Sequence, residues 1–212
     1  MGVVHAVLTT VALVLLGGTG YALVVVLSLR LRNVVARQIE VSEMPPEVME
    51  ALRGLVEEMW DEELSLVALQ QEQRSAGDKA WAAVSRDASG TTWAVAQLGR
   101  TLFTREQRVH FVLYTRTGKG SVIVTARREP AVFVTPSMWR ATVAEFDSVS
   151  SQCETHRESI QAYGGGKNVK PMGNYEEFRE WYQKQGEREL DTLWERQLLT
   201  NGPQDSFRFD FA

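Results

Sequence analysis

Cys153 and His156 are the pair of side chains in this sequence whose types and spacing best suit chemistry. The chain holds one cysteine and three histidines. Residues three apart share a face of a helix, so a thiolate and an imidazole at these positions could act as nucleophile and base. With His110 added from elsewhere in the chain, the same side chains could bind zinc in three positions.

A structural interpretation of this pair rests on its surroundings. Cys153 and His156 continue an apolar stripe with steps of three and four residues, which is typical of one buried helix face. Such a cysteine behaves as a small hydrophobe, and neither a third catalytic group nor an oxyanion-stabilising device is identifiable. We therefore predict core residues and assign no catalytic, cofactor-binding or metal-binding residue. An enzyme that uses Cys153 and His156 is the alternative. The stripe consists of Phe146, Val149, Cys153, His156, Ile160 and Tyr163.

Two glycine-rich segments resemble phosphate-binding loops but lack their essential groups. At Gly118-Lys119-Gly120, Leu113 stands where the first glycine of a P-loop belongs, and Gly120 replaces the hydroxyl that binds magnesium. The segment 164–167 ends with lysine, but it follows a predicted helix, whereas a P-loop follows a strand. The sequence also lacks G-x-S-x-G, H-E-x-x-H and dinucleotide-binding motifs. We therefore predict no nucleotide cofactor.

The first 29 residues predict a single membrane-spanning helix. The run from Val3 to Leu29 contains no Asp, Glu, Lys or Arg, and about 20 apolar residues suffice to cross the hydrocarbon core. A cleaved signal peptide would need a cationic start and a shorter apolar region. Residues 1–5 carry no Lys or Arg. We therefore assign 1–29 to an uncleaved single-pass anchor.

The charges that flank the run predict its orientation. Arg30, Arg32 and Arg37 follow it, and cationic residues stay on the cytoplasmic side of a span. The N-terminus should therefore face outward and the remaining chain the cytosol, next to membrane lipid. A single cysteine agrees with a reducing compartment.

Small residues form a patch inside the run, at Gly17, Gly18, Gly20 and Ala22. Gly18 and Ala22 are four apart, so they share a face on which a second helix could pack closely. The patch predicts a membrane-protein partner or a second copy of the chain. Ordinary tolerance of glycine in membrane helices is the alternative interpretation.

Residues 30–212 have the composition of a soluble domain. The whole chain has 24% charged residues and a formal net charge of −4, which argues against a nucleic-acid partner. We expect 30–39 to continue the helix out of the membrane, within a juxtamembrane segment and linker over 30–46. The soluble domain is assigned to 47–200 and the tail to 201–212.

The periodicity of the domain predicts an α+β fold with an antiparallel sheet of four to five strands. Helices are expected at 47–62, 137–163 and 174–200. Hairpins are expected at 80–84 with 91–98 and at 108–115 with 121–126, and an edge strand at 132–135. The segment 64–73 fits a helix or a strand equally well.

The tail alternates aromatic and charged residues, which predicts a strand. Phe207, Phe209 and Phe211 would share one side and could dock on the domain's own sheet or on a partner. With the anchor, this favours a membrane-tethered non-catalytic interaction module, such as an accessory subunit of a larger membrane complex. A membrane-proximal enzyme and a small-ligand sensing domain are the alternatives.

Overall fold

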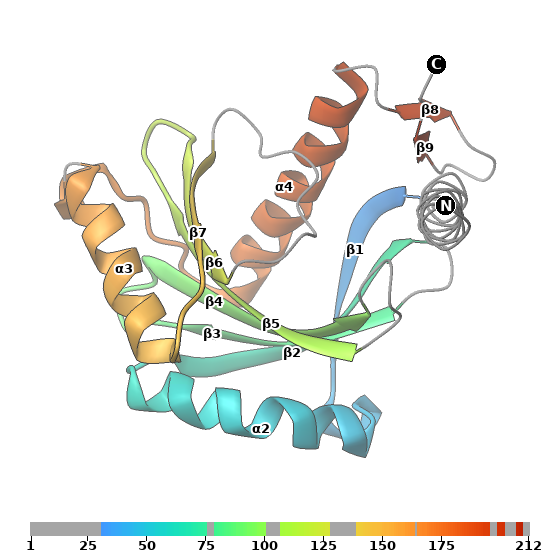
Figure 1. The fold of residues 1–212 in the computed structure, drawn as a ribbon, viewed down its shortest axis with the longest axis horizontal. Coiled ribbons are helices and arrows are strands. Elements are labelled where there is room, and N and C mark those ends of the chain that lie inside the picture. Colours follow the sequence, from blue (N-terminus) through green and yellow to red (C-terminus); the bar gives the residue numbers. More distant parts are fainter. Residues whose placement is uncertain are drawn as a thin grey trace, which may run out of the picture.

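The computed structural model describes residues 31–75, 79–100, 107–127, 139–163, 165–195, 199–201 and 207–209. Over these residues the chain folds as a mixed β-sheet flanked by helices, which confirms the α+β class (Figure 1). The predicted anchor, its small-residue patch and Arg30 lie outside this part of the chain. Among the helices that are described, none combines the length and the apolar character needed to cross a membrane.

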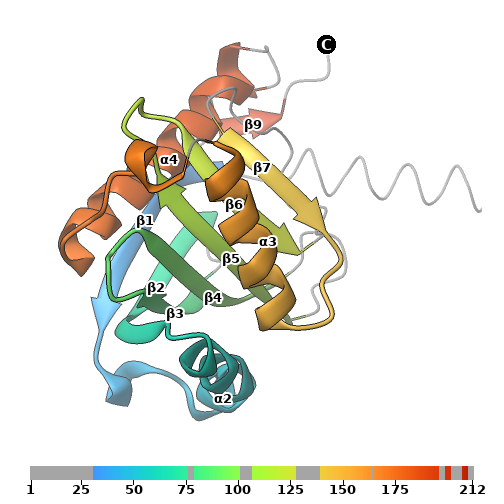
Figure 2. The same cartoon turned by 90° about the vertical axis from the view of Figure 1, so that its left-hand side faces the viewer.

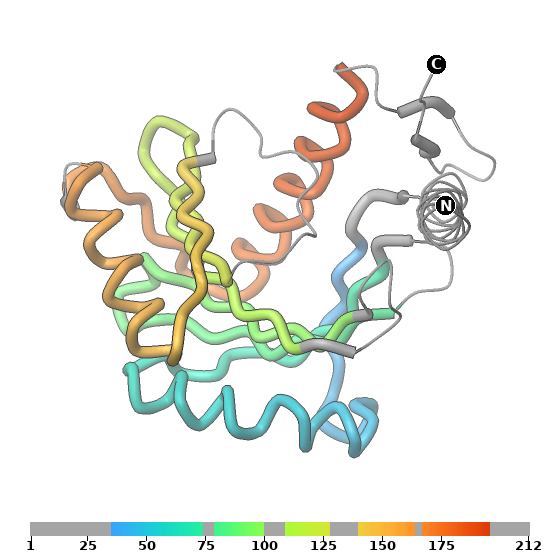
Figure 3. The backbone as a smooth tube through the Cα atoms, in the orientation of Figure 1, coloured from blue at the N-terminus to red at the C-terminus, as the bar shows by residue number. Residues whose placement is uncertain are grey.

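The elements follow one another from β1 to β9, and Figure 3 traces the backbone by residue number from α2 to α4. They are β1 (Leu31–Ile39), η1 (Val41–Glu43), α2 (Pro46–Asp61), β2 (Ser65–Ser75), β3 (Lys79–Arg86), β4 (Thr92–Arg100), β5 (Gln107–Arg116), β6 (Val122–Arg127), β7 (Trp139–Ala144), α3 (Val149–Ala162), η2 (Gly165–Asn168), α4 (Tyr175–Glu195), β8 (Leu199–Asn201) and β9 (Phe207–Phe209).

The sheet is larger than the predicted four to five strands. Strands β1 to β7 form its main body, and the three-residue strands β8 and β9 extend it beyond β1, in the order β7-β6-β5-β4-β3-β2-β1-β9-β8. Neighbours from β1 to β6 pair antiparallel, and β7 pairs parallel with β6. Strands β1, β7 and β8 were not expected, β2 occupies the segment 64–73 that fitted either structure, and β9 lies in the tail.

The prediction that residues 30–39 continue a helix is wrong, because residues 31–39 form strand β1. β1 pairs with β2 from Leu31 opposite Ser75 to Ile39 opposite Leu69. Ile39 is buried in the core, and the carbonyl of Ala36 accepts a hydrogen bond from Gln183 of α4. A nine-residue segment with weak periodicity takes the structure that its partners impose, here a neighbouring strand and a covering helix.

The predicted helix 137–163 begins twelve residues later than expected, at Val149. Residues 139–144 form β7 instead, paired along their length with β6. Ser148 then caps α3: its hydroxyl accepts a hydrogen bond from the backbone N–H of Ser151, and the Ser151 hydroxyl accepts one from the N–H of Ser148. This reciprocal cap fixes the start of the helix. Phe146 therefore extends the apolar stripe in sequence only.

The remaining elements agree with their predictions except at the end of the last helix. Helix 47–62 and both hairpins are confirmed as α2, β3–β4 and β5–β6, and the ambiguous segment 64–73 is strand β2. The expected helix 174–200 is confirmed as α4 as far as Glu195, with Asn174 as its cap: the Asn174 side-chain oxygen accepts from the N–H of Glu177 at 2.9 Å. Its expected end is wrong, because residues 199–201 form strand β8, which pairs with β9. The expected edge strand at 132–135 lies outside the described residues.

The two faces of the sheet carry two separate hydrophobic cores. α2 and α3 pack on one face, where Leu52, Met59 and Leu113 are buried. α4 packs on the other, where the rings of Trp93 and Phe178 stack with their centroids 4.4 Å apart. Figure 1 shows α2 and α4 on opposite sides of the sheet, and Figure 2 shows α3 crossing its outer strands.

The tail is described in part. Residues 207–209 form β9, which lies antiparallel to β8 and places Phe207 opposite Leu31 of β1. Phe211 lies outside the described residues. The sequence prediction of a strand in the tail is therefore confirmed for 207–209, while its contact with a partner stays a prediction.

The loop before α4 is held to the sheet by two arginines and a glycine. Arg86 donates to the carbonyl of Gly173 at 2.6 Å, and Arg116 donates to Glu177 at 2.6 Å and to the carbonyl of Pro171. The N–H of Met172 donates to the carbonyl of Gly90, a residue with φ +70°. A Cβ at this position would lie 2.6 Å from the Met172 carbonyl oxygen.

This contact predicts that Gly90→Ala destabilises the fold more than Gly120→Ala. Both glycines have positive φ, but nothing lies within 4 Å of a Cβ at Gly120. Gly120→Ala should therefore cost about 1 kcal/mol for the backbone conformation alone. Gly90→Ala must also displace the loop and should cost on the order of 3 kcal/mol. Urea unfolding of both variants measures the difference, and equal losses would contradict the role given to the Gly90–Met172 contact.

Candidate functional site

His156 lies between two threonines in the core beneath α3. Its Nε2 lies 3.0 Å from the Thr115 hydroxyl and its Nδ1 2.8 Å from the Thr125 hydroxyl, and the residue is 1% exposed. In a neutral imidazole one ring nitrogen donates and the other accepts, and each threonine hydroxyl can complement either role. Burial lowers the pKa of His156 to about 4; the Asp87 carboxylate raises it, and the Arg157 guanidinium lowers it. His156 is therefore neutral at physiological pH.

Cys153 lies one turn earlier on the same buried side of α3. It belongs to the core that α3 shares with α2 and is 5% exposed. Burial raises the pKa of its thiol to about 11, the Glu62 carboxylate raises it as well, and Arg157 opposes them. Reactive cysteines are accessible and form thiolates near neutral pH. The environment of Cys153 favours the thiol, so it agrees with the structural interpretation of this residue.

The zinc site considered for Cys153, His156 and His110 is excluded by the sheet itself. Along β5, Phe111, Leu113 and Thr115 face α3, because Phe111 and Leu113 share the core with Cys153 and Thr115 contacts His156. His110 alternates with them and so points to the opposite face. In the part of the chain that the structure describes, no three His, Cys, Asp or Glu side chains form a potential metal site.

Gln152 completes a polar layer around His156. Its amide nitrogen donates to the backbone carbonyls of Phe111 and Thr125, both at 2.9 Å, while its side-chain oxygen is buried without a hydrogen-bond partner. The Ser85 hydroxyl, which lies in the same row of the sheet as Thr125, is also buried and unpartnered. This layer ties α3 to β5 and β6.

A second buried polar cluster lies on the opposite face of the sheet, beneath α4, and sequence reasoning missed it. Its centre is Glu72 of β2, which is fully buried. The carboxylate accepts hydrogen bonds from the side-chain amides of Gln70 and Gln97, both at 2.6 Å, and from the Tyr182 hydroxyl at 3.3 Å. Tyr175 donates in turn to the side-chain oxygen of Gln70 at 2.9 Å. We call these five residues the Glu72 cluster.

The long polar side chains of the cluster on β2 lie opposite small residues of the neighbouring strand, β3. Gln70 and Glu72 stand opposite Ala82 and Ala80 of β3 in the register. Tyr175 and Tyr182 come from the first two turns of α4, seven residues apart and so on one face. Burial raises the pKa of the Tyr175 hydroxyl to about 12, so this group donates as a neutral phenol. The Arg179 guanidinium opposes the shift, and the Glu72 carboxylate adds to it.

The Glu72 cluster can orient a carboxylate within a buried face, which suits either recognition of a small polar ligand or fixation of α4. The sequence signal was the alternation of Gln70 and Glu72, which marks one polar side of a strand. The segment 64–73 fits a helix as well as a strand, so this alternation alone does not predict the cluster. Strand pairing and the position of α4 were needed to bring Gln97 and Tyr182 to the same place.

Comparisons with protein-family models, with curated proteins and with solved structures find no match for this chain. The interpretation of both buried polar groups therefore rests on their geometry.

The buried neutral His156 predicts a loss of stability in mild acid. The unfolded chain takes up a proton below pH 6.5, the ordinary histidine pKa, whereas folded His156 stays neutral until about pH 4. Its contribution is therefore present above pH 6.5 and is lost as the pH falls. Between pH 7.5 and 5 the free energy of unfolding should fall by about 2 kcal/mol from this residue. Denaturant unfolding of the wild type and of His156→Gln measures it, and an unchanged slope in the variant would contradict the assignment.

The hydrogen bonds of Glu72 predict that Glu72→Gln lowers the free energy of unfolding by about 1–3 kcal/mol. The glutamine side chain has the same size but only one acceptor oxygen, whereas the Glu72 carboxylate accepts from two amide donors with two oxygens. Glu57→Gln, on the exposed side of α2, is the matched control and should be neutral. If Glu72→Gln unfolds at a higher denaturant concentration than the wild type, Glu72 lowers the stability of the fold. That result is expected of a residue retained to bind a ligand rather than to hold α4 in place.

Proposed function

We propose that the protein is a membrane-tethered, non-catalytic interaction module, such as an accessory subunit of a larger membrane complex. The observation that carries this proposal is the uncharged run from Val3 to Leu29, followed at once by Arg30 and Arg32. On this proposal the N-terminus faces outward, the folded domain faces the cytosol, and the small residues from Gly17 to Ala22 pack against a partner helix or a second copy.

The fold supports a close coupling between such an anchor and the domain. β1 begins at Leu31, two residues after the run ends, in place of the juxtamembrane helix and linker that the sequence suggested. The strand pairs with β2 and lies under α4. A span that ends at residue 29 would therefore hold the sheet directly at the membrane surface, and a partner in the membrane would meet a domain of fixed position.

The burial and protonation of Cys153 and His156 support a non-catalytic role. Cys153 is a buried thiol with a raised pKa, and His156 is a neutral ring engaged by two threonines. A nucleophile and base would need access to substrate and a hydrogen bond between them. These contacts are typical of core residues.

A second candidate function, binding of a small polar ligand, is favoured by the Glu72 cluster alone. A buried carboxylate with amide and phenol donors is a device that ligand sites use for orientation. The stability of Glu72→Gln, described above, separates this candidate from a structural role of the cluster.

The proposal predicts that the full chain resists alkaline extraction from membranes. A cytosol-dependent reporter fused after Ala212 should be active, because the arginines that follow the span hold the domain inside. Leu15→Arg combined with Val24→Arg should release the chain, since a charge at the centre of a span costs about 2.5–3.5 kcal/mol and no uncharged stretch of about 20 residues then remains. Val41→Arg, at a position 61% exposed, is the control and should remain membrane-bound.

Release of the unsubstituted chain by alkali would contradict the anchor. Activity only of a reporter that requires export would contradict the orientation and leave the anchor in place.

A further inference from the structure

One end of the sheet carries a basic residue on each of five neighbouring strands. It is the end at which β1 begins, β2 ends, β3 begins, β4 ends and β5 begins. The terminal two residues of each strand contain one arginine or lysine and no Asp or Glu. We call this set the basic sheet end. It consists of Arg32, Arg74, Lys79, Arg100 and Arg108.

The register places these five residues at one level. Leu31 lies opposite Ser75, Gln73 opposite Lys79, and Gly99 opposite Arg108. Neighbouring strands lie about 4.8 Å apart, so the five strand ends extend over about 19 Å. A chain with a net charge of −4 thus concentrates positive residues along one edge of its fold.

The opposite ends of the same five strands differ. Their terminal pairs contain two basic residues, Arg86 and Arg116, and both are engaged within the fold. Arg86 donates to the Gly173 carbonyl, and Arg116 donates to Glu177 and the Pro171 carbonyl. Contacts within the fold thus account for both arginines at that end.

We propose that the basic sheet end contacts the anionic phosphate headgroups of the membrane in which the chain is anchored. This inference rests on the proposed function. From the end of the run at Leu29 to Leu31 the chain spans two residues, about 7 Å when extended. That distance is within the Debye length of about 8 Å at physiological ionic strength. Clusters of Lys and Arg at this distance are attracted by anionic lipids.

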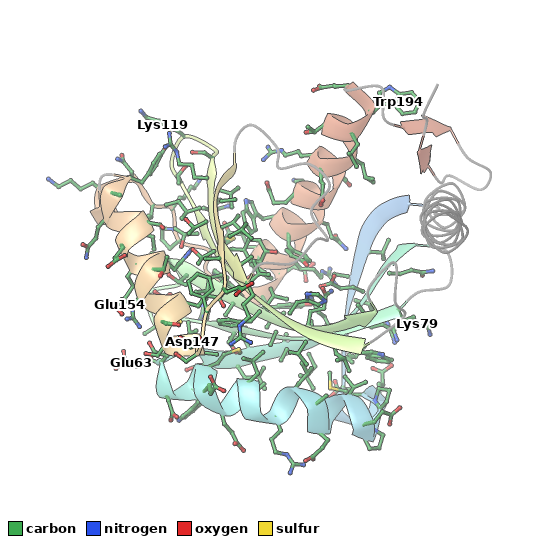
Figure 4. All side chains as sticks on the ribbon, viewed as in Figure 1. Glu63, Lys79, Lys119, Asp147, Glu154 and Trp194 are labelled. Carbon is green, nitrogen blue, oxygen red and sulfur yellow. The ribbon has the colours of Figure 1, made fainter. Side chains whose placement is uncertain are left out.

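Headgroup contact would give the domain a defined orientation on the bilayer. The five strands would stand with their basic ends toward the lipid, and the β5–β6 turn would point away from it. Figure 4 shows Lys79 and Lys119 on opposite sides of the molecule, Lys79 at the basic sheet end and Lys119 in that turn. Both side chains are exposed, so each can carry a probe.

The test uses the full chain in nanodiscs of phosphatidylcholine alone or with about one third phosphatidylglycerol. Lys79→Cys and Lys119→Cys, which remove the same charge, are each labelled with a polarity-sensitive fluorophore, and labelling of buried Cys153 is measured in the unsubstituted chain. We expect the probe at 79 to shift its emission when anionic lipid is present, and the probe at 119 to stay unchanged. About 1 M salt should abolish the shift, because the Debye length falls to about 3 Å.

A charge-reversal pair sharpens the test. In the Lys79→Cys chain, Arg74→Glu with Arg100→Glu should abolish most of the lipid-dependent shift. Arg53→Glu with Lys184→Glu changes net charge equally at exposed positions elsewhere and should preserve it. The salt dependence is measured in the Lys79→Cys chain without these reversals, so that part of the test does not depend on whether a charge-reversal variant folds.

The outcomes separate this inference from the proposed function. A chain that enters nanodiscs but gives the same emission at position 79 in both lipids overturns the inference and leaves the anchor standing. Equal shifts at 79 and 119 also overturn it, because the contact would then not be specific to the basic sheet end. A chain that does not enter nanodiscs overturns the proposed function, and the inference with it.

Discussion

The alternation of side chains across one continuous sheet is the constraint on which the other features of this domain depend. Because successive residues of a strand face opposite ways, β5 sends Phe111 and Leu113 toward α2 and α3 and the alternating Val112 and Tyr114 toward α4. The same rule places His110 on the face of the sheet opposite to His156. It also places the Glu72 cluster and the polar layer around His156 in separate cores, on opposite faces of the sheet. A register slip of one residue would exchange the two cores.

Both interiors contain polar groups whose hydrogen bonds demand one arrangement of the neighbouring helix. Gln152 donates to two strand carbonyls and His156 bridges two threonines, so α3 can neither slide nor rotate without losing these bonds. On the other face Tyr182 reaches Glu72 from α4. Buried polar groups cost free energy unless they are hydrogen-bonded, and they thereby favour the single packing in which they are satisfied.

Local patterns in the sequence were sufficient to predict the two hairpins, α2 and the start of α4. The strands of the two hairpins alternate, α2 begins at the second of two prolines, and Asn174 caps α4, so each of these could be predicted from neighbouring residues. The same approach failed for residues 31–39, 139–144 and 199–201, which are strands because β2, β6 and β9 lie beside them. The candidate sites show the same division. The burial of Cys153 and His156 followed from a helical stripe, whereas the Glu72 cluster joins two strands and a helix that only the tertiary fold brings together.

The place of β1 also has a consequence for synthesis of the chain. β1 is complete at residue 39, but its partner β2 ends at residue 75, and α2 lies between them. At about 5–20 residues per second, the ribosome needs roughly 2–7 s to supply that partner. During this interval the nascent strand has no neighbour from its own chain and exposes a complete row of backbone donors and acceptors. The interval from Ile39 to Ser75 is therefore the period of biogenesis in which a chaperone or the translocation machinery would have to shield β1.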